Sequence, residues 1–254
     1  MEAAKQQAYD LLTALQYSVA DIPESDERRA DLRAADATST YLVEVKQKLD
    51  DNDSLEADSR RMADGEVISH LETLSHHNRV DAILKDGRDQ LDLTPKSNGD
   101  FRLVWFVASG IDRHVYWKRA FATFYGSVQL LALKPPSDRI VDCFYFDYSA
   151  AWSMPTVDAM VLVDHDNLQL CLNEFSPQLD AFRESSLCKQ LSDAVVDPLR
   201  LVADNSIIAL HSDVSRKHED VVLDELFRQT GIRYTALRPK QHSASAMVDR
   251  EYTT

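Results

Sequence analysis

Apolar and polar residues follow one another along this chain in segments whose period changes between that of a helix and that of a strand. In residues 3–17 the apolar positions recur at helical spacing and predict a helix. Residues 30–35 and 40–48 are rich in β-forming side chains and predict two strands, joined by the turn-forming segment 36–39. A further short strand is expected at 17–20. This part of the chain therefore predicts one helix followed by three strands.

The middle of the chain carries a long helical pattern and one continuous apolar run. Residues 55–91 have apolar positions at helical spacing, and the turn-forming pair Asn98-Gly99 follows them. Residues 101–108 read FRLVWFVA, which is typical of a strand buried on both faces. A helix over 112–125 and a second buried strand over 128–133 come next. The predicted order is thus helix, three strands, helix, strand, helix and strand.

The second half of the chain continues this alternation. The expected elements are strands at 140–148, 159–163, 168–172, 207–210 and 232–237, and helices at 177–196 (in two pieces) and 219–229. The polar residues 241–254 are expected to be frayed. Such alternation predicts an α/β fold. Pro135-Pro136 is the plausible boundary, so we divide the chain into a core at 1–134 and a C-terminal α/β region at 135–254, which extends or continues that core.

The composition narrows the class of protein. The 254 residues include 28 Lys and Arg against 42 Asp and Glu, a net charge of −14, so at long range the chain repels nucleic acid. No apolar run approaches the roughly 18 residues of a membrane span, and no glycine-rich nucleotide-binding motif occurs. The three cysteines cannot all pair with one another and lack metal-ligand spacing. We therefore expect a cytoplasmic protein without membrane contact or nucleotide cofactor.

One group of charged residues stands out against this background. Asp31 lies in the first β-rich segment, and Glu44 and Lys46 lie in the second. Because side chains alternate along a strand, Glu44 and Lys46 share a face while Val43 and Val45 point the other way. If the strands pair antiparallel, two carboxylates and a backbone carbonyl such as that of Val45 can hold Mg²⁺. With a lysine to orient water and steady charge, this set suits phosphodiester hydrolysis.

These residues carry a resemblance to a known family. Asp31, twelve intervening residues and then Glu44-Val45-Lys46 resemble the motif of the PD-(D/E)XK nuclease superfamily, and the order of elements over 1–134 is similar to its core. The residue before Asp31 is Ala30, where the motif has proline. The resemblance implies a restriction-endonuclease-like mixed sheet flanked by helices. It also implies Mg²⁺ or Mn²⁺ at Asp31 and Glu44, with Lys46 as a catalytic residue beside these two acids.

Two positions of this site stay open. Asp36 is a rival for Asp31 as a metal ligand, although it lies nearer the turn, where a role in shaping the turn is expected. Many members of the superfamily place a third acid on the first helix, and both Glu2 and Asp10 qualify.

Basic residues elsewhere suggest contacts with nucleic acid. Three on the predicted helix after Asp112 are candidates for phosphate binding beside aromatic side chains: Arg113, Lys118 and Arg119. An ordinary amphipathic helix is the simpler interpretation of that segment. Three more flank Asp31 and either meet phosphate or serve solubility: Arg28, Arg29 and Arg33.

The function expected from these observations is Mg²⁺-dependent hydrolysis of nucleic-acid phosphodiester bonds, with DNA as the favoured substrate. One alternative is a non-catalytic, nuclease-like interaction or assembly protein. Another is a nuclease subunit that relies on a basic partner protein, or on a homo-oligomer, to bind DNA. The net charge of −14 favours the two alternatives, because an acidic chain alone is a poor ligand for DNA.

Overall fold

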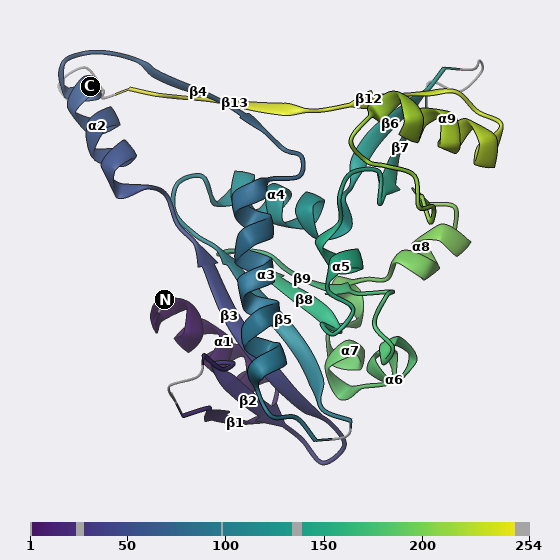
Figure 1. Cartoon of the computed structure of the whole chain (residues 1–254). Coiled ribbons are helices and arrows are strands. Elements are labelled where there is room, and N and C mark those ends of the chain that lie inside the picture. Colours follow the sequence, from purple (N-terminus) through teal and green to yellow (C-terminus); the bar gives the residue numbers. More distant parts are fainter. Residues whose placement is uncertain (1, 24–27, 98, 134–138, 247–254) are drawn as a thin grey trace.

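The structure is a computed structural model that describes residues 2–23, 28–97, 99–133 and 139–246. Its centre is a mixed seven-stranded sheet in the order β1-β2-β3-β5-β8-β9-β10 (Figure 1). The strands are β1 (Ser18–Asp21), β2 (Leu32–Ala35), β3 (Thr40–Lys48), β5 (Phe101–Ala108), β8 (Ala159–Val163), β9 (Leu168–Leu172) and β10 (Val195–Val196). β1, β2 and β3 form an antiparallel meander, whereas β3, β5 and β8 run parallel. The expected α/β fold with a mixed sheet is confirmed.

Helices cover both faces of this sheet. One face packs against α1 (Glu2–Ala14), α6 (Leu179–Arg183) and α7 (Ser186–Gln190), and the other against α3 (Asn78–Leu93), α4 (Arg113–Tyr125) and α5 (Ala150–Ser153). Ala4, Ala8 and Leu12 recur every four residues along α1 and are buried on the sheet, as the helical spacing predicts. In the described part of the chain, no helix combines the length and apolarity that crossing a membrane requires.

The apolar run at 101–108 forms a strand that is buried along its whole length. All eight residues of β5 are buried, because the strand lies between β3 and β8 and beneath helices on both faces. Trp105 packs into the core on the side of α1, and Val104 and Phe106 pack into the core on the side of α3. The prediction of a strand buried on both faces is confirmed.

The strand predicted at 128–133 is present as β6 (Val128–Ala132), but it lies outside the central sheet. A second sheet has the order β11-β7-β6-β12, and its other strands are β7 (Ile140–Phe144), β11 (Ile207–Ala209) and β12 (Tyr234–Leu237). Val222 and Leu226 of α9 (Glu219–Thr230) pack on this sheet. The expectation that β6 completes the core sheet was wrong: β8 takes that place. An apolar run indicates a strand but does not select its neighbour.

Both larger sheets draw strands from either side of the expected boundary between residues 134 and 135. β6 pairs with β7, and the central sheet gains β8, β9 and β10 from the second half of the chain. Pro135-Pro136 itself lies outside the described residues. Both halves of the chain therefore contribute strands to shared sheets.

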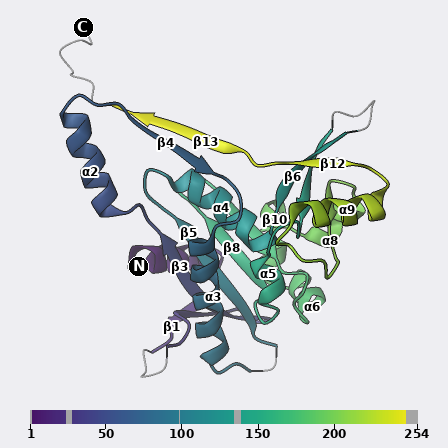
Figure 2. The same cartoon turned by 45° about the horizontal axis from the view of Figure 1, so that its top comes forward.

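The helical pattern expected over 55–91, as one helix or more, was wrong in its middle. The chain instead forms α2 (Asn52–Ala63), then β4 (Ile68–Thr73), then α3. β4 pairs antiparallel with β13 (Lys240–Ser245), so these residues are a strand where frayed chain was expected, and 247–254 lie outside the described residues. Figures 1 and 2 show α2 and this two-stranded ribbon reaching away from the central sheet. Pairing with a strand far along the chain outweighs the local helical spacing of Ile68 and Leu71.

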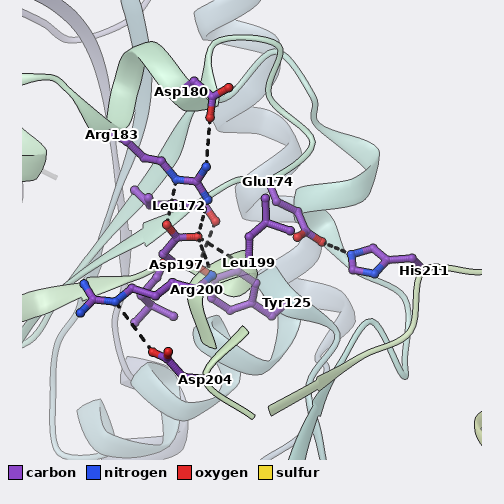
Figure 3. Close-up of polar contacts among 11 residues, drawn as sticks. Tyr125, Leu172, Glu174, Asp180, Arg183, Asp197, Leu199, Arg200, Asp204 and His211 are labelled. Carbon is purple, nitrogen blue, oxygen red and sulfur yellow. Dashed lines mark hydrogen bonds and ion pairs between the residues drawn. The ribbon is translucent and has the colours of Figure 1, made fainter. Parts of the chain in front are cut away.

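Polar contacts link the far edge of the central sheet to the elements around the second sheet (Figure 3). The two helices predicted over 177–196 are α6 and α7, and they are followed by a short helix that was not expected, α8 (Pro198–Ala203). Asp197 caps α8 and accepts two hydrogen bonds of 2.8 Å from Arg183 of α6. Glu174, just after β9, bonds through Oε1 to Nε2 of His211, just after β11, at 2.6 Å. This last pair links the segment after β9 of the central sheet to the segment after β11 of the second sheet.

Replacing Glu174 with Gln is expected to weaken its contact with His211, and with it the fold, at acidic pH. The hydrogen bond to Glu174 raises the pKa of His211 above its ordinary value, although burial works in the opposite direction. A raised histidine pKa means that the pair stabilises the fold below about pH 6.5, and that this contribution is lost as the pH rises through the folded-state pKa. We expect Glu174→Gln to cost about 1 kcal/mol of unfolding free energy near pH 6, since solvent screens the half-exposed imidazole, and less near pH 9.

Urea denaturation at the two pH values measures this difference, and an NMR titration of His211 reports the accompanying fall in its pKa. Asp166→Asn is the matched control, because Asp166 pairs with the exposed His165 and should matter little at either pH. An equal loss of stability at both pH values would contradict the assignment.

Candidate functional site

The pairing of β2 and β3 decides whether the three acidic and basic residues singled out in the sequence meet. The two strands are antiparallel, with Leu32 opposite Val43. The N–H of Asp31 donates to the carbonyl of Val43 at 3.1 Å, which extends the ladder by one residue beyond β2. Asp31 is thereby fixed next to the stretch of β3 that carries Glu44 and Lys46.

Alternation along β3 sends its apolar and charged side chains to opposite faces. Val43 and Val45 belong to the core that packs under α1. Glu44 and Lys46 point the other way, toward α3. Gly87 of α3 faces Lys46: a Cβ at this position would lie 3.4 Å from Cε of Lys46, in ordinary van der Waals contact. The face predicted for the two charged side chains is therefore the face beneath α3.

The carboxylate of Asp31 has one oxygen fixed by the backbone. Its Oδ2 accepts the N–H of Val45 at 2.9 Å. Its Oδ1 lies 4.0 Å from Nζ of Lys5 on α1, and that ammonium is closer to Asp21, at 2.7 Å. Of the two carboxylate oxygens of Asp31, Oδ1 thus has the longer contact with its partner.

Glu44 is a buried carboxylate with one unsatisfied oxygen. Its residue is 2% exposed, Oε1 lies 2.7 Å from Nζ of Lys46, and Oε2 has no hydrogen-bond partner. Burial raises the pKa of Glu44 to about 7, and the nearby Asp31 carboxylate pushes it in the same direction against the opposing effect of Lys46. A buried acid that is expensive to ionise and has a free oxygen is typical of a site that binds a cation.

The ammonium of Lys46 lies between two carboxylates from different elements. Besides Glu44, it contacts Oδ2 of Asp86 on α3 at 2.6 Å. Lys46 is 8% exposed, so its stem is packed and its charge is held at a defined place. Glu44 and Asp86 thus fix the position of the Lys46 ammonium from two sides.

The charged side chains described above, except that of Asp21, line one cavity of about 720 Å³. Its acidic members are Asp31, Glu44 and Asp86. Its basic members are Lys5, Arg28, Arg29 and Lys46. Basic side chains therefore outnumber acidic ones by one along this cavity, in a chain whose net charge is −14.

Two carboxylates of this cavity are the candidates for holding a divalent cation. Within the described ranges no three His, Cys, Asp or Glu side chains form a group that could hold a metal ion. The expected set is smaller, since it uses Asp31, Glu44 and a backbone carbonyl, and Mg²⁺ keeps several waters besides its protein ligands. The unpartnered Oε2 of Glu44 fits this set, because a buried carboxylate oxygen without a partner needs a reason to persist.

The structure separates Asp36 from this group. Its Oδ1 accepts the N–H groups of Thr38 at 2.7 Å and Ser39 at 2.8 Å, which closes the turn between β2 and β3. Asp36 does not line the cavity that holds Asp31. Its role is the turn-shaping one expected for this position.

The two acids considered on the first helix also differ. Glu2 lines a neighbouring cavity of about 590 Å³ together with Lys5 and Asp31. Asp10 is exposed and accepts a hydrogen bond from Gln6 of its own helix at 2.8 Å. The acid of α1 that lies toward Asp31 is therefore Glu2.

The basic residues proposed on α4 lie away from the cavity. Arg119 is buried, donates to the carbonyl of Thr73 at 2.9 Å and pairs with Glu72, so it holds β4 against α4. Arg113 lies 3.7 Å from Asp166. Lys118 lines a different, smaller cavity. Arg119 serves the fold, which is a physical reason against its proposed contact with nucleic acid.

The arginines around Asp31 divide into two groups. Arg28 and Arg29 line the cavity. Arg33 instead pairs with the buried Asp100 at 3.2 Å. The sequence reasoning missed Asp86 altogether, although a signal was present: Ile83, Asp86 and Gln90 follow at helical spacing and share the α3 face that lines the cavity.

Comparison with known proteins adds no relative. The chain matches no protein-family model, no curated protein and no solved structure. The case for any function therefore depends on the residues of the cavity and on their arrangement.

Proposed function

We propose that this chain is a metal-dependent nuclease of the PD-(D/E)XK type, in which Asp31 and Glu44 hold Mg²⁺ or Mn²⁺ and Lys46 acts on the scissile phosphate. The observation that carries the proposal is Glu44: a buried carboxylate with an unpartnered oxygen, next to a second carboxylate and a fixed lysine in one cavity. Such a combination is costly for folding and is explained by a cation and an anionic substrate.

The topology supports the same proposal. After α1, the chain forms the antiparallel strands β1, β2 and β3, crosses over through α3 to the parallel β5, and continues through α4 to the parallel β8. This is the order of helix, three strands, helix, strand, helix and strand that the resemblance implies. α2 and β4 are then an insertion between β3 and α3, and β6 and β7 an insertion before β8.

The chemistry of the proposed reaction can be assigned to side chains. Asp31 and Glu44 would hold the metal, which when bound polarises a phosphoryl oxygen and lowers the pKa of a bound water. Lys46 keeps its ammonium beside the phosphate, where it orients the attacking water and offsets the negative charge that develops. Arg28 and Arg29 also line the cavity and are placed to contact phosphates of DNA.

The rival function is a non-catalytic assembly protein with a nuclease-like core. It is favoured by the net charge of −14 and by exposed apolar side chains beside and on the ribbon, where Val67 is 66% and Leu71 is 59% exposed. A nuclease that binds DNA through a basic partner or through a homo-oligomer is consistent with both the residues of the cavity and the acidic, partly apolar surface. Cleavage by the isolated chain separates these functions.

We expect the wild-type protein to nick supercoiled plasmid in Mg²⁺ or Mn²⁺ and to be inactive in EDTA. Asp31→Asn should lower the rate at least about 100-fold, because a neutral amide is a poorer ligand for a hard cation. Isothermal titration calorimetry with Mn²⁺ should show the matching loss of metal affinity. Asp36→Asn, at the other end of β2, keeps the turn and should leave both measurements unchanged. Nicking that resists EDTA, or that survives in Asp31→Asn, would overturn the site.

A further inference from the structure

Asp86 of α3 bridges two cations that come from different parts of the fold. Its Oδ2 lies 2.6 Å from Nζ of Lys46, and its Oδ1 lies 3.0 Å from Nη1 of Arg28. Gln90, one turn further along α3, donates to Oδ2 at 2.9 Å. Both oxygens of this carboxylate are therefore in contact with positively charged groups.

Asp86 occupies the two cations, Lys46 and Arg28, that an anionic substrate would also bind. A phosphodiester also presents two anionic oxygens, and Lys and Arg are the side chains that bind them by charge-assisted hydrogen bonds. Lys46 and Arg28 cannot give their charge fully to a phosphate while the carboxylate lies between them. Although burial works against it, the contact with Lys46, together with Arg28, lowers the pKa of Asp86, so the carboxylate stays ionised at neutral pH.

The cavity shows that the two anions would compete for the same volume. Asp86 lines the cavity that also holds Asp31 and Glu44, and its side chain is 40% exposed, so water and ligands reach it. Asp86 is not needed to fill the core, because Val80, Leu84 and Leu91 supply the buried face of α3. The bridge from Arg28 to Lys46 thus lies in the cavity that the proposed substrate would enter.

We propose that Asp86 is an internal phosphate mimic, whose carboxylate must leave Lys46 and Arg28 before a nucleic-acid phosphate can bind between them. This inference rests on the proposed nuclease function. It adds that, in the protein without substrate, the Asp86 carboxylate occupies Lys46 and Arg28. Neutralising Asp86 should release both cations for substrate.

The test is the affinity of Asp86→Asn for a short fluorescein-labelled DNA duplex, measured by fluorescence anisotropy in EDTA so that neither metal nor cleavage contributes. We expect binding about tenfold tighter than that of the wild type. We also expect the slope of log affinity against log salt to steepen by about 1 for each cation that gains a phosphate contact. Asp86→Ser provides the same neutralisation in a second side chain, and thermal melting shows that each variant is folded.

Asp89→Asn is the matched control, because it changes the net charge equally on the same helix, where Asp89 pairs with the neighbouring Arg88 outside the cavity. Adding Arg28→Ala to Asp86→Asn should remove part of the gain. Unchanged or weaker binding by the Asp86 variants, or an equal gain in Asp89→Asn, overturns the inference. Tighter binding without any cleavage in Mg²⁺ would keep the phosphate mimic and reject the nuclease, whereas cleavage without tighter binding would do the reverse.

Discussion

Replacing Lys46 with Met is expected to reduce metal-dependent cleavage of plasmid about 10³-fold while leaving the fold and the metal affinity in place. The ammonium is the cation nearest to Glu44, at 2.7 Å, and removing it takes away the group that orients water and offsets charge on the phosphate. Met keeps the aliphatic stem that packs at Gly87. Calorimetry should show Mn²⁺ binding at least as tightly as in the wild type, since the two carboxylates lose a competing cation.

Lys48→Met is the control for this result. Lys48 lies two residues further along the same strand, donates to the carbonyl of Leu49 and stacks over the ring of Tyr116, outside the lining of the cavity. It should retain wild-type cleavage. If Lys46→Met cleaves at the wild-type rate with purified protein, Lys46 has no catalytic role and the proposed mechanism is wrong.

Glu44→Gln is expected to stabilise the protein at alkaline pH while abolishing metal binding. The pKa of Glu44 is raised in the fold from 4.5 to about 7, chiefly by burial. A raised carboxyl pKa means that the folded state keeps a proton which the unfolded state has lost, so stability falls as the pH rises from about 4.5 to about 7 and then levels off. Each pKa unit corresponds to 1.36 kcal/mol, so the variant should gain about 3 kcal/mol near pH 8 and nothing near pH 4.

Chemical denaturation across this pH range measures the gain, and it should be repeated with Mg²⁺. Metal that binds only the folded state stabilises it, so Mg²⁺ should raise the stability of the wild type near pH 8 and have no effect on Glu44→Gln. Glu184→Gln is the control, because Glu184 is exposed, pairs with Lys189, and should change stability little. A variant less stable than the wild type at every pH would mean that the Glu44 carboxylate stabilises the fold, and would contradict the prediction.

These two variants and Asp86→Asn address different features of one cavity. Lys46 would act on the phosphate, Glu44 would hold the metal, and Asp86 would compete with the substrate for Lys46 and Arg28. The expected directions differ accordingly: loss of cleavage with metal binding kept, gain of stability with metal binding lost, and gain of DNA affinity without metal. No single defect in folding produces all three patterns.

Local pattern was sufficient for the part of the site that lies on two neighbouring strands. Glu44 and Lys46 fall on one face because side chains alternate along β3, and Asp31 lies beside them because β2 and β3 are joined by a short turn closed by Asp36. The same local logic identified the buried strand at 101–108 and the short strand before Asp31. Contacts between residues close in sequence depend on backbone geometry that the sequence specifies directly.

Other features depended on contacts between distant parts of the chain, and only the tertiary structure decided them. β4 is a strand because β13, far along the chain, pairs with it, although its own apolar spacing fits a helix. β6 was expected in the core sheet and pairs with β7 and β12 instead. Asp86 reaches Lys46 because α3 crosses back over β3, so its contact spans 40 residues. The sequence by itself determined the α/β class and placed Asp31 at the start of a strand next to the one that carries Glu44 and Lys46. The tertiary structure decided what surrounds them, because burial and partnership are set by elements that no local period can specify.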